Sequence, residues 1–256
     1  MEVFFICLVA LGASLLTLFS GFGLGTILMP AMAIFFPLDT AIALTAVVHF
    51  ANNFFKLILL GRSARRDVVL RFGASAFAAA FLGAKILFLL ESVTPVLSYS
   101  LGGRIFEVTF IKLAVAALII LFLVLEMSPA FSKISFPLKF LPVGGAVSGF
   151  LGGLSGHQGA LRAAFLVRCN LSKESFIATG VVIACLVDVS RIFVYSGHLS
   201  SSVGENKLLL LSATLAAFTG VFAGTRLLKK ITMAAVQKIV SAMLAVIALL
   251  LALGLV

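Results

Sequence analysis

The glycine-rich stretch Gly152-Gly153-Leu154-Ser155-Gly156-His157-Gln158-Gly159 interrupts a long apolar segment in the second half of the chain. That segment covers residues 141–167 and also contains Gly149. The first half holds a matching uncharged segment, residues 3–36, which Gly21-Phe22-Gly23-Leu24-Gly25 interrupts. Inside a bilayer, backbone that leaves helical geometry must be buried in protein or line a wet cavity. Two interruptions at matching places therefore predict a transport site.

The composition of the chain is that of a membrane protein. Hydrophobic residues make up 62% and charged residues 11%, and the mean hydropathy is +1.25. An ordinary soluble domain is about 25% charged. Because a helix needs ~20 apolar residues to cross the bilayer, the 256 residues leave room for about eight spans. The net charge of +10 fits anionic lipid headgroups, and we expect no nucleic-acid partner.

We predict an all-α integral membrane protein with about eight transmembrane helices in two repeated four-helix halves. The expected spans are two glycine-broken first helices at residues 3–36 and 141–167, and helices at residues 40–60, 68–90, 109–125, 175–195, 208–228 and 235–256. Residues 127–140, which include Pro129 and Pro137, are expected to connect the halves outside the membrane. The repeats then cover residues 1–126 and 141–256 within one membrane domain.

Corresponding charges support an internal duplication. Asn53-x-x-Lys56 precedes Asp188-x-x-Arg191, and Gly25 precedes Gly159, at nearly the same offset. If each half crosses the membrane four times, the halves point the same way, whereas a broken segment that turns back inverts them. The sequence leaves both arrangements open. It also leaves the membrane orientation open, because the loop cations, with Arg62 on one predicted side and Lys173 on the other, are balanced.

The two breaks supply groups that suit an anion. Glycine lets the backbone leave the helix, and a restarted half-helix presents a positive N-terminal end. Pro30 is compatible with the first turn of the restarted helix. The guanidinium fork of Arg162 fits sulfonate or carboxylate oxygens. The predicted substrate-binding residues are Gly21, Gly23, Gly25, Ser155, Gly156, His157, Gln158, Gly159 and Arg162.

Polar and ionisable side chains inside the spans predict the transport route. The predicted pathway residues are His49, Asn52, Asn53, Lys56, Asp188 and Arg191. A coupling proton on His157 or Asp188, or a coupling sodium ion, is a further hypothesis. Two plainer interpretations compete with these roles. Glycines also permit close helix packing, and Arg162 also has the reach to snorkel to an interface.

Two halves that each open on a glycine-broken segment resemble the TauE/SafE sulfite exporter family (TSUP). The similarity rests on Gly21-Phe-Gly23-Leu-Gly25 with Pro30, and on the stretch from Gly152 to Gly159. It implies a multi-pass carrier in the bacterial inner membrane that moves small sulfur-containing anions, such as sulfite or organosulfonates, by secondary transport. The chain departs from the family pattern at Leu24 and at His157-Gln158 with Arg162, so the resemblance supports the fold more firmly than the substrate.

Two other functions stay open on the sequence. One is a passive anion channel, which sequence separates poorly from a carrier. The other is a rhomboid-like intramembrane serine protease, because Gly153-Leu-Ser155-Gly156 matches G-x-S-G. Its serine needs a base, and the only histidine after His157 is His198, in an expected polar turn. We expect no catalytic residues, no cofactor and no metal, since the three cysteines lack ligand spacing. The expected partners are a small anion and the lipid bilayer, and the oligomeric state stays open.

Overall fold

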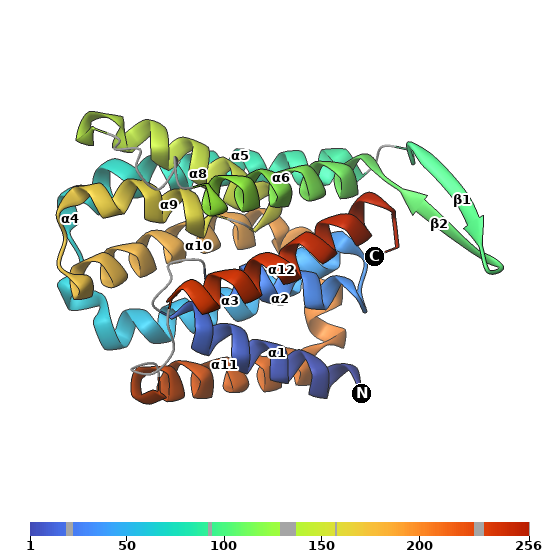
Figure 1. Cartoon of the computed structure of the whole chain (residues 1–256), viewed down its shortest axis with the longest axis horizontal. Helices are drawn as coiled ribbons and strands as arrows, with labels where there is room; N and C mark the ends of the chain where they lie inside the picture. The colour runs from blue at the N-terminus through green and yellow to red at the C-terminus, as the bar shows by residue number, and fades with distance from the viewer. Residues whose placement is uncertain (19–22, 92–93, 129–136, 157, 228–232, 256) are drawn as a thin grey trace.

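The computed structural model describes residues 1–18, 23–91, 94–128, 137–156, 158–227 and 233–255. These residues form a bundle of helices with one β-hairpin projecting from it (Figure 1). The first half contains α1 (Glu2–Thr17), α2 (Gly25–Ala33), α3 (Leu38–Leu60), α4 (Arg66–Val68), α5 (Ala74–Glu91), β1 (Leu97–Leu101), β2 (Arg104–Val108) and α6 (Phe110–Met127). The second half contains α8 (Leu141–Ser155), α9 (Gly159–Leu166), α10 (Lys173–Glu205), α11 (Lys207–Leu227) and α12 (Met233–Ala252).

The helices confirm a multi-pass α-helical membrane protein. In the described part of the chain, five helical stretches are long and apolar enough to span: Leu38–Leu59, Arg66–Leu87, Leu138–Ser155, Lys173–Ser196 and Lys207–Gly224. Two shorter apolar helices cover Glu2–Thr17 and Phe110–Leu121. Large apolar side chains such as Phe54, Phe193 and Phe222 point outward from these helices. So much exposed apolar surface requires contact with lipid.

Both broken segments turn back on themselves. In the second half, the Ser148 hydroxyl on α8 donates to the carbonyl of Gln158 over 3.2 Å, just before α9 begins. In the first half, the rings of Phe5 and Phe35, near the start of α1 and after α2, lie 5.7 Å apart. The chain therefore enters along α1 or α8, reverses at the break, and returns along α2 or α9 (Figure 1).

Each half packs against the other in the same way. The first helix of each half runs along the third long helix of the other half, since α1 contacts α11 and α8 contacts α5. The second helices, α3 and α10, are antiparallel neighbours: the Arg65 backbone N–H donates to Thr179 Oγ1 and Asn53 contacts Asp188. The last helices, α6 and α12, also pack together. These pairings build one continuous bundle from the two halves.

Three glycines of α8 serve helix packing rather than the break. A Cβ atom at Gly145, Gly149 or Gly153 would collide with the backbone carbonyls of residues 72, 76 and 80. Small residues at every fourth position let two membrane helices approach this closely. Helix α8 is continuous through Ser155. The interpretation of Gly149 and Gly153 as part of the break is therefore wrong, as it is for the helical Gly152.

Three local features differ from the prediction. Strands β1 and β2 form an antiparallel hairpin, with Leu97 opposite Val108, where no strand was expected. Helix α10 continues to Glu205, so the polar turn expected around His198 is wrong. Pro30 is the sixth residue of α2, beyond its first turn. Helix α10 is longer than the predicted span, because the polar residues after residue 195 continue the same α-helix.

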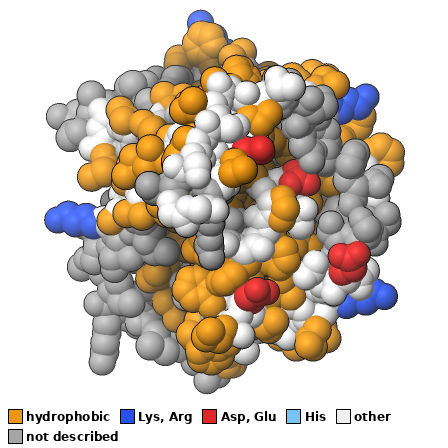
Figure 2. All heavy atoms as spheres, turned by 90° about the vertical axis from the view of Figure 1, so that its right-hand side faces the viewer, with side chains coloured by type: hydrophobic (Ala, Val, Ile, Leu, Met, Phe, Trp, Pro, Cys, Tyr) orange, Lys and Arg blue, Asp and Glu red, His pale blue; other side chains and the backbone are white. Residues whose placement is uncertain are grey.

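The two ends of the bundle differ in charge. The end where α3 stops and α10 starts carries the cations Arg62, Arg65, Arg66, Arg71, Lys139, Arg168 and Lys173, with the carboxylates of Asp67 and Glu174. The opposite end, which faces the viewer in Figure 2, carries the carboxylates of Glu2, Asp39, Glu107 and Glu205 together with the cations Lys112 and Lys207. The expected balance between sides is wrong, because the return of α9 places Arg168 and Lys173 at the same end as Arg62.

Candidate functional site

The site begins where the two breaks meet. Gly23 and Gly156 have φ angles of +87° and +77°, a left-handed conformation that glycine adopts without steric cost. A Cβ atom at Gly25, the first residue of α2, would lie 3.7 Å from the carbonyl oxygen of Gly156. The breaks thus lie side by side inside the bundle, as predicted. Gly21 and His157, both predicted site residues, lie outside the described residues.

A cluster of buried polar groups on α3 and α10 lies beside the breaks. His49 Nδ1 is 2.6 Å from Asp188 Oδ2, and the Asn53 amide donates to the same oxygen over 3.1 Å. Arg191 donates from Nε to Asp188 Oδ1 over 3.0 Å, and its Nη2 atom lies 2.9 Å from the same oxygen as an ion pair. The exposed fraction of each of these four residues is 4% or less. A buried ion pair with further hydrogen bonds therefore joins the two halves.

Asp188 is fully engaged as an ionised carboxylate. One oxygen accepts the Nε–H of Arg191 and is ion-paired with its Nη2 atom, and the other accepts the Asn53 N–H and faces His49. A buried carboxylate survives as an ion only when donors and counter-charge surround it. Within the described chain, Arg191 Nη1 has no hydrogen-bond partner, and it would lie 3.0 Å from a Cβ atom at Gly156. The Arg191 guanidinium therefore faces Asp188 with Nε and Nη2, and faces Gly156 of the second break with Nη1.

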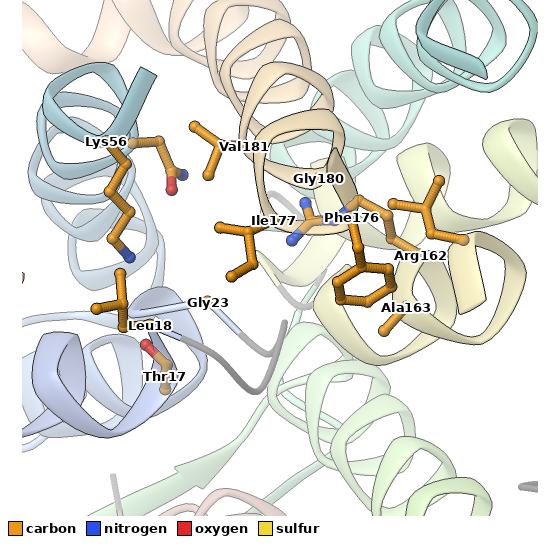
Figure 3. A pocket seen from close by; sticks show the side chains of 12 residues that line it. Thr17, Leu18, Gly23, Lys56, Arg162, Ala163, Phe176, Ile177, Gly180 and Val181 are labelled. Atoms are coloured by element: carbon orange, nitrogen blue, oxygen red, sulfur yellow. The ribbon is translucent and has the colours of Figure 1, made fainter. Parts of the chain in front are cut away.

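A cationic pocket opens next to this cluster (Figure 3). Its polar side chains come from Asn53 and Lys56 on α3, Arg162 on α9 and Thr17 on α1, and Gly23 of the first break completes that wall. Its remaining lining residues are Leu18, Ala163, Leu166, Phe176, Ile177, Gly180 and Val181. In Figure 3 the Lys56 and Arg162 side chains enter the pocket from different helices.

The charge of this pocket is positive. Lys56 and Arg162 are 3% and 6% exposed, and no carboxylate is among the described lining residues. Among the described residues, no hydrogen bond or ion pair to Lys56 is found. Taking such a cation out of water without a partner is costly. Lys56, with the guanidinium of Arg162 at the same cavity, favours the binding of a negatively charged ligand there.

The cavity is small. Its volume is about 40 Å³, whereas one water needs roughly 10–15 Å³ by a comparable measure. The space therefore suits a solute of a few heavy atoms. The side chains of Phe176 and Ile177 on α10 add no donors or acceptors, so the polar contacts come from Arg162 beside Phe176 and from Lys56, Asn53 and Thr17 on other helices.

The other predicted residues lie near the pocket but do not line it. Ser155 donates to the carbonyl of Leu151 in its own helix, so its hydroxyl is oriented along α8. Asn52 accepts from the Ser14 hydroxyl over 3.2 Å. Gln158 precedes Gly159, the first residue of α9, and is 4% exposed. Its Oε1 atom has no hydrogen-bond partner among the described residues.

Sequence reasoning missed the apolar wall and one structural tyrosine. Phe176, Ile177, Gly180 and Val181 line the pocket from two turns of α10. Their i, i+4 spacing is a signal for one helix face, but any buried face shows it. Tyr195 donates to the Gly153 carbonyl over 2.7 Å and ties α10 to the end of α8. In the described ranges, no three His, Cys, Asp or Glu side chains are arranged to hold a metal ion.

Comparison with known proteins identifies a family for this chain. No curated protein and no solved structure matches the chain. A family model described as "Sulfite exporter TauE/SafE" matches residues 6–251, nearly the whole length. The chain therefore belongs to the sulfite exporter TauE/SafE family of membrane transporters.

Proposed function

We propose that this protein is a secondary transporter that exports a small anion across the bacterial inner membrane. Sulfite, an organosulfonate or another sulfur-containing anion is the proposed substrate. Family membership supports transport, and the buried pair Lys56 and Arg162 around a small cavity without a carboxylate supports the anion. That cationic pocket is the observation that carries the proposal.

The donors of the pocket match a small oxyanion. The Arg162 guanidinium can bind two oxygens side by side, and the Lys56 ammonium can bind a third as a point charge. Asn53 lines the same wall. Each hydrogen bond to a charged group contributes roughly 1.5–3 kcal/mol. A tetrahedral or pyramidal anion of a few heavy atoms would use all of these donors within the cavity.

Eight membrane segments in two inverted repeats are part of the proposal. The two halves support it by packing on each other in the same way. Helix α1 packs on α11 as α8 packs on α5, and each of these first helices is followed by a segment that turns back. Asn53 and Asp188 correspond in the sequence and touch each other. When equivalent residues of two related halves touch, they lie close to the two-fold axis that relates the halves. In an inverted repeat this axis lies in the membrane plane.

The charge of the two ends supports export. Short loops rich in lysine and arginine lie on the cytoplasmic side of membrane proteins. We therefore place the basic end, with Arg62, Arg65 and Lys173, in the cytoplasm. Phe176 lines the pocket and comes three residues after the start of α10 at Lys173. At ~1.5 Å per residue, Phe176 lies within one helical turn of the basic end of α10. The pocket is therefore close to the cytoplasmic side, and we propose that the anion enters from there.

A coupling ion, either a proton or sodium, completes the proposed transport cycle. A secondary transporter moves its substrate by linking it to a second gradient. The buried charges of the site are the groups through which such a link would act. The oligomeric state is no part of the proposal.

The experiment is a counterflow assay in proteoliposomes. Vesicles loaded with unlabelled sulfite, thiosulfate, methanesulfonate or acetate are diluted into a trace of the same labelled anion. We expect rapid exchange of at least one sulfur-containing anion and little exchange of acetate. In Arg162→Ala we expect the apparent affinity for the anion to be ~10–100-fold weaker, because the anion loses one charged hydrogen-bonding partner. Lys139→Ala, which removes an exposed cation outside the pocket, should exchange like the wild type.

The same vesicles separate a carrier from a passive anion channel. A carrier saturates and shows counterflow, because loaded anion on one side accelerates entry of label from the other. A channel shows conductance that rises with concentration without counterflow. Absence of exchange for every anion, with folded protein in the vesicles, would contradict the proposed function.

A further inference from the structure

We propose that His49 carries the coupling proton, and that protonation of its Nε2 atom switches the anion pocket to its binding state. This inference rests on the proposed function, because it names the coupling ion and its site in that transporter. It starts from the position of one imidazole ring, which touches the charged cluster with one nitrogen and the first break with the other.

The hydrogen bonds of Asp188 determine which nitrogen is free. Asp188 Oδ1 accepts the Nε–H of Arg191 and is ion-paired with its Nη2 atom, and Oδ2 accepts the Asn53 amide N–H. An ionised carboxylate only accepts, so His49 Nδ1, 2.6 Å from Oδ2, must be the donor. The neutral ring then has its lone pair on Nε2. Gain or loss of a proton takes place at that atom.

Nε2 lies against two residues of the anion pocket. A Cβ atom at Gly23 would be 2.9 Å from Nε2, and the ring also lies against Gly25 of α2. The Asn53 amide nitrogen lies over the ring edge, 3.0 Å from Nδ1 and 3.3 Å from Nε2. Both Gly23 and Asn53 line the pocket that holds Lys56 and Arg162. The titrating atom therefore sits directly behind the wall of the proposed anion site.

Protonation changes this wall in two ways. It adds a positive charge beside the pocket, which attracts an anion. It also converts Nε2 from an acceptor into a donor, so Nε2 no longer offers a lone pair to the Asn53 N–H, which still donates to Asp188 Oδ2. By linkage, the bound anion must stabilise the proton by the same factor with which the proton stabilises the anion. Proton and anion then cross the membrane in the same direction: an anion that leaves down its own gradient carries a proton out, and an outside-acid gradient drives the reverse reaction, uptake.

The surrounding charges leave His49 as the titrating group of this cluster. From α10, Asp188 and Arg191 face the ring, and Lys56 acts on it from its own helix. Arg162 on α9 lines the adjoining pocket. Helix α2 contributes no titratable residue, and α1 carries only Glu2 and Cys7, near its outer end. Histidine is the side chain whose unperturbed pKa places its charge change between pH 5 and 8.

The test separates coupling from exchange. Proteoliposomes in sodium-free buffer, with the membrane potential clamped at zero, receive an outside-acid pH gradient and the labelled anion that exchanges fastest in the counterflow panel. For one proton per anion we expect wild-type accumulation of about tenfold per pH unit. Nigericin should abolish it. Protein-free vesicles measure any pH-driven movement of the anion itself.

His49→Gln is the decisive variant. It retains a hydrogen-bonding side chain but has no titratable proton, so we expect counterflow with a weaker apparent affinity that no longer depends on pH, and no pH-driven accumulation. His49→Gln that still accumulates the anion in response to the pH gradient would overturn the proposal, as would a His49→Gln variant whose counterflow affinity equals that of the wild type. Lys139→Ala is the control and should accumulate like the wild type.

The wild-type protein tests the same claim without any variant. Counterflow without pH-driven accumulation, or accumulation that requires sodium and ignores the pH gradient, would overturn proton coupling while leaving the proposed function intact. Absence of both counterflow and accumulation would instead contradict the proposed function.

Discussion

Corresponding positions in the two halves carry a cation in different electrostatic surroundings. In the second half, Asp188 stands three residues before Arg191 and binds it at 2.9–3.0 Å. In the first half, Asn53 occupies the place of that carboxylate, and Lys56 has no counter-ion among the described residues. One carboxylate therefore separates a structural ion pair from a cation that is available to a ligand. The asymmetry between the halves, rather than their similarity, builds the anion site.

Removing the carboxylate of the second half should have the largest effect. Asp188→Asn leaves Arg191 buried without a counter-ion, which we expect to lower the free energy of unfolding by about 3–5 kcal/mol. The apparent Tm of the detergent-solubilised protein measures this change. Asp188→Asn combined with Arg191→Gln should recover most of the loss, because no charge is then left unpaired. Equal Tm values for the single variant and the wild type would contradict the account of the ion pair.

The first helices of the two halves should tolerate bulk very differently. Gly149→Val on α8 pushes a side chain into the backbone of residue 76, and overpacking of this kind costs about 1–3 kcal/mol or more. Gly12→Val on α1 is the matched control, because no atom lies within 4 Å of a Cβ there. We expect poor yield of monodisperse protein for Gly149→Val alone. Similar yields for both variants would show that the α8–α5 contact is looser than described.

The two hinges should respond alike to a side chain. Alanine at Gly156 or Gly23 must adopt a positive φ, which costs about 1–2 kcal/mol per residue. Each of these variants should therefore lower the Tm by a few degrees. Gly12→Ala, inside α1, should leave the Tm unchanged or raise it. A Tm of Gly156→Ala equal to that of the wild type would indicate that the second break is not held in the left-handed conformation.

Making the first half resemble the second should weaken anion binding moderately. Asn53→Asp places a carboxylate three residues before Lys56, where it can neutralise the cation as Asp188 neutralises Arg191. It also removes the amide that donates to Asp188 Oδ2, so we expect the Tm to fall as well. We expect the apparent affinity for the anion in counterflow to fall about tenfold. Asn53→Ala, which leaves Lys56 unpaired, should bind better than Asn53→Asp. The reverse order would contradict the role given to the unpaired lysine.

Much of the fold could be predicted because hydrophobicity and helix breakers are local properties. Long apolar segments and glycine clusters predict broken helices at the right places, and the ordered repetition of Asn53-x-x-Lys56 as Asp188-x-x-Arg191 predicts related halves. Which glycines open the helix and which pack it could not be predicted. Gly149 and Gly156 look alike in the sequence, and only the approach of α5 distinguishes them.

The site was predicted in part for the same reason. Ionisable residues in an apolar span are conspicuous, so Lys56, Asp188 and Arg162 could be named in advance. Their partners depend on how the helices cross, and no local signal pairs His49 with Asp188. The hairpin carried a signal that was overlooked: Gly102-Gly103 between alternating strands is typical of a two-residue turn, and both glycines have positive φ.

The central claim is that a small anion binds between Lys56 and Arg162 at the meeting point of the two breaks. The most direct measurement is a structure of the protein soaked with selenite, a heavier analogue of sulfite, in which anomalous scattering locates the selenium. The account predicts a selenium peak in the pocket, within hydrogen-bonding reach of Lys56 Nζ and the Arg162 guanidinium. A peak only at other sites, with this pocket empty at saturating selenite, would contradict it.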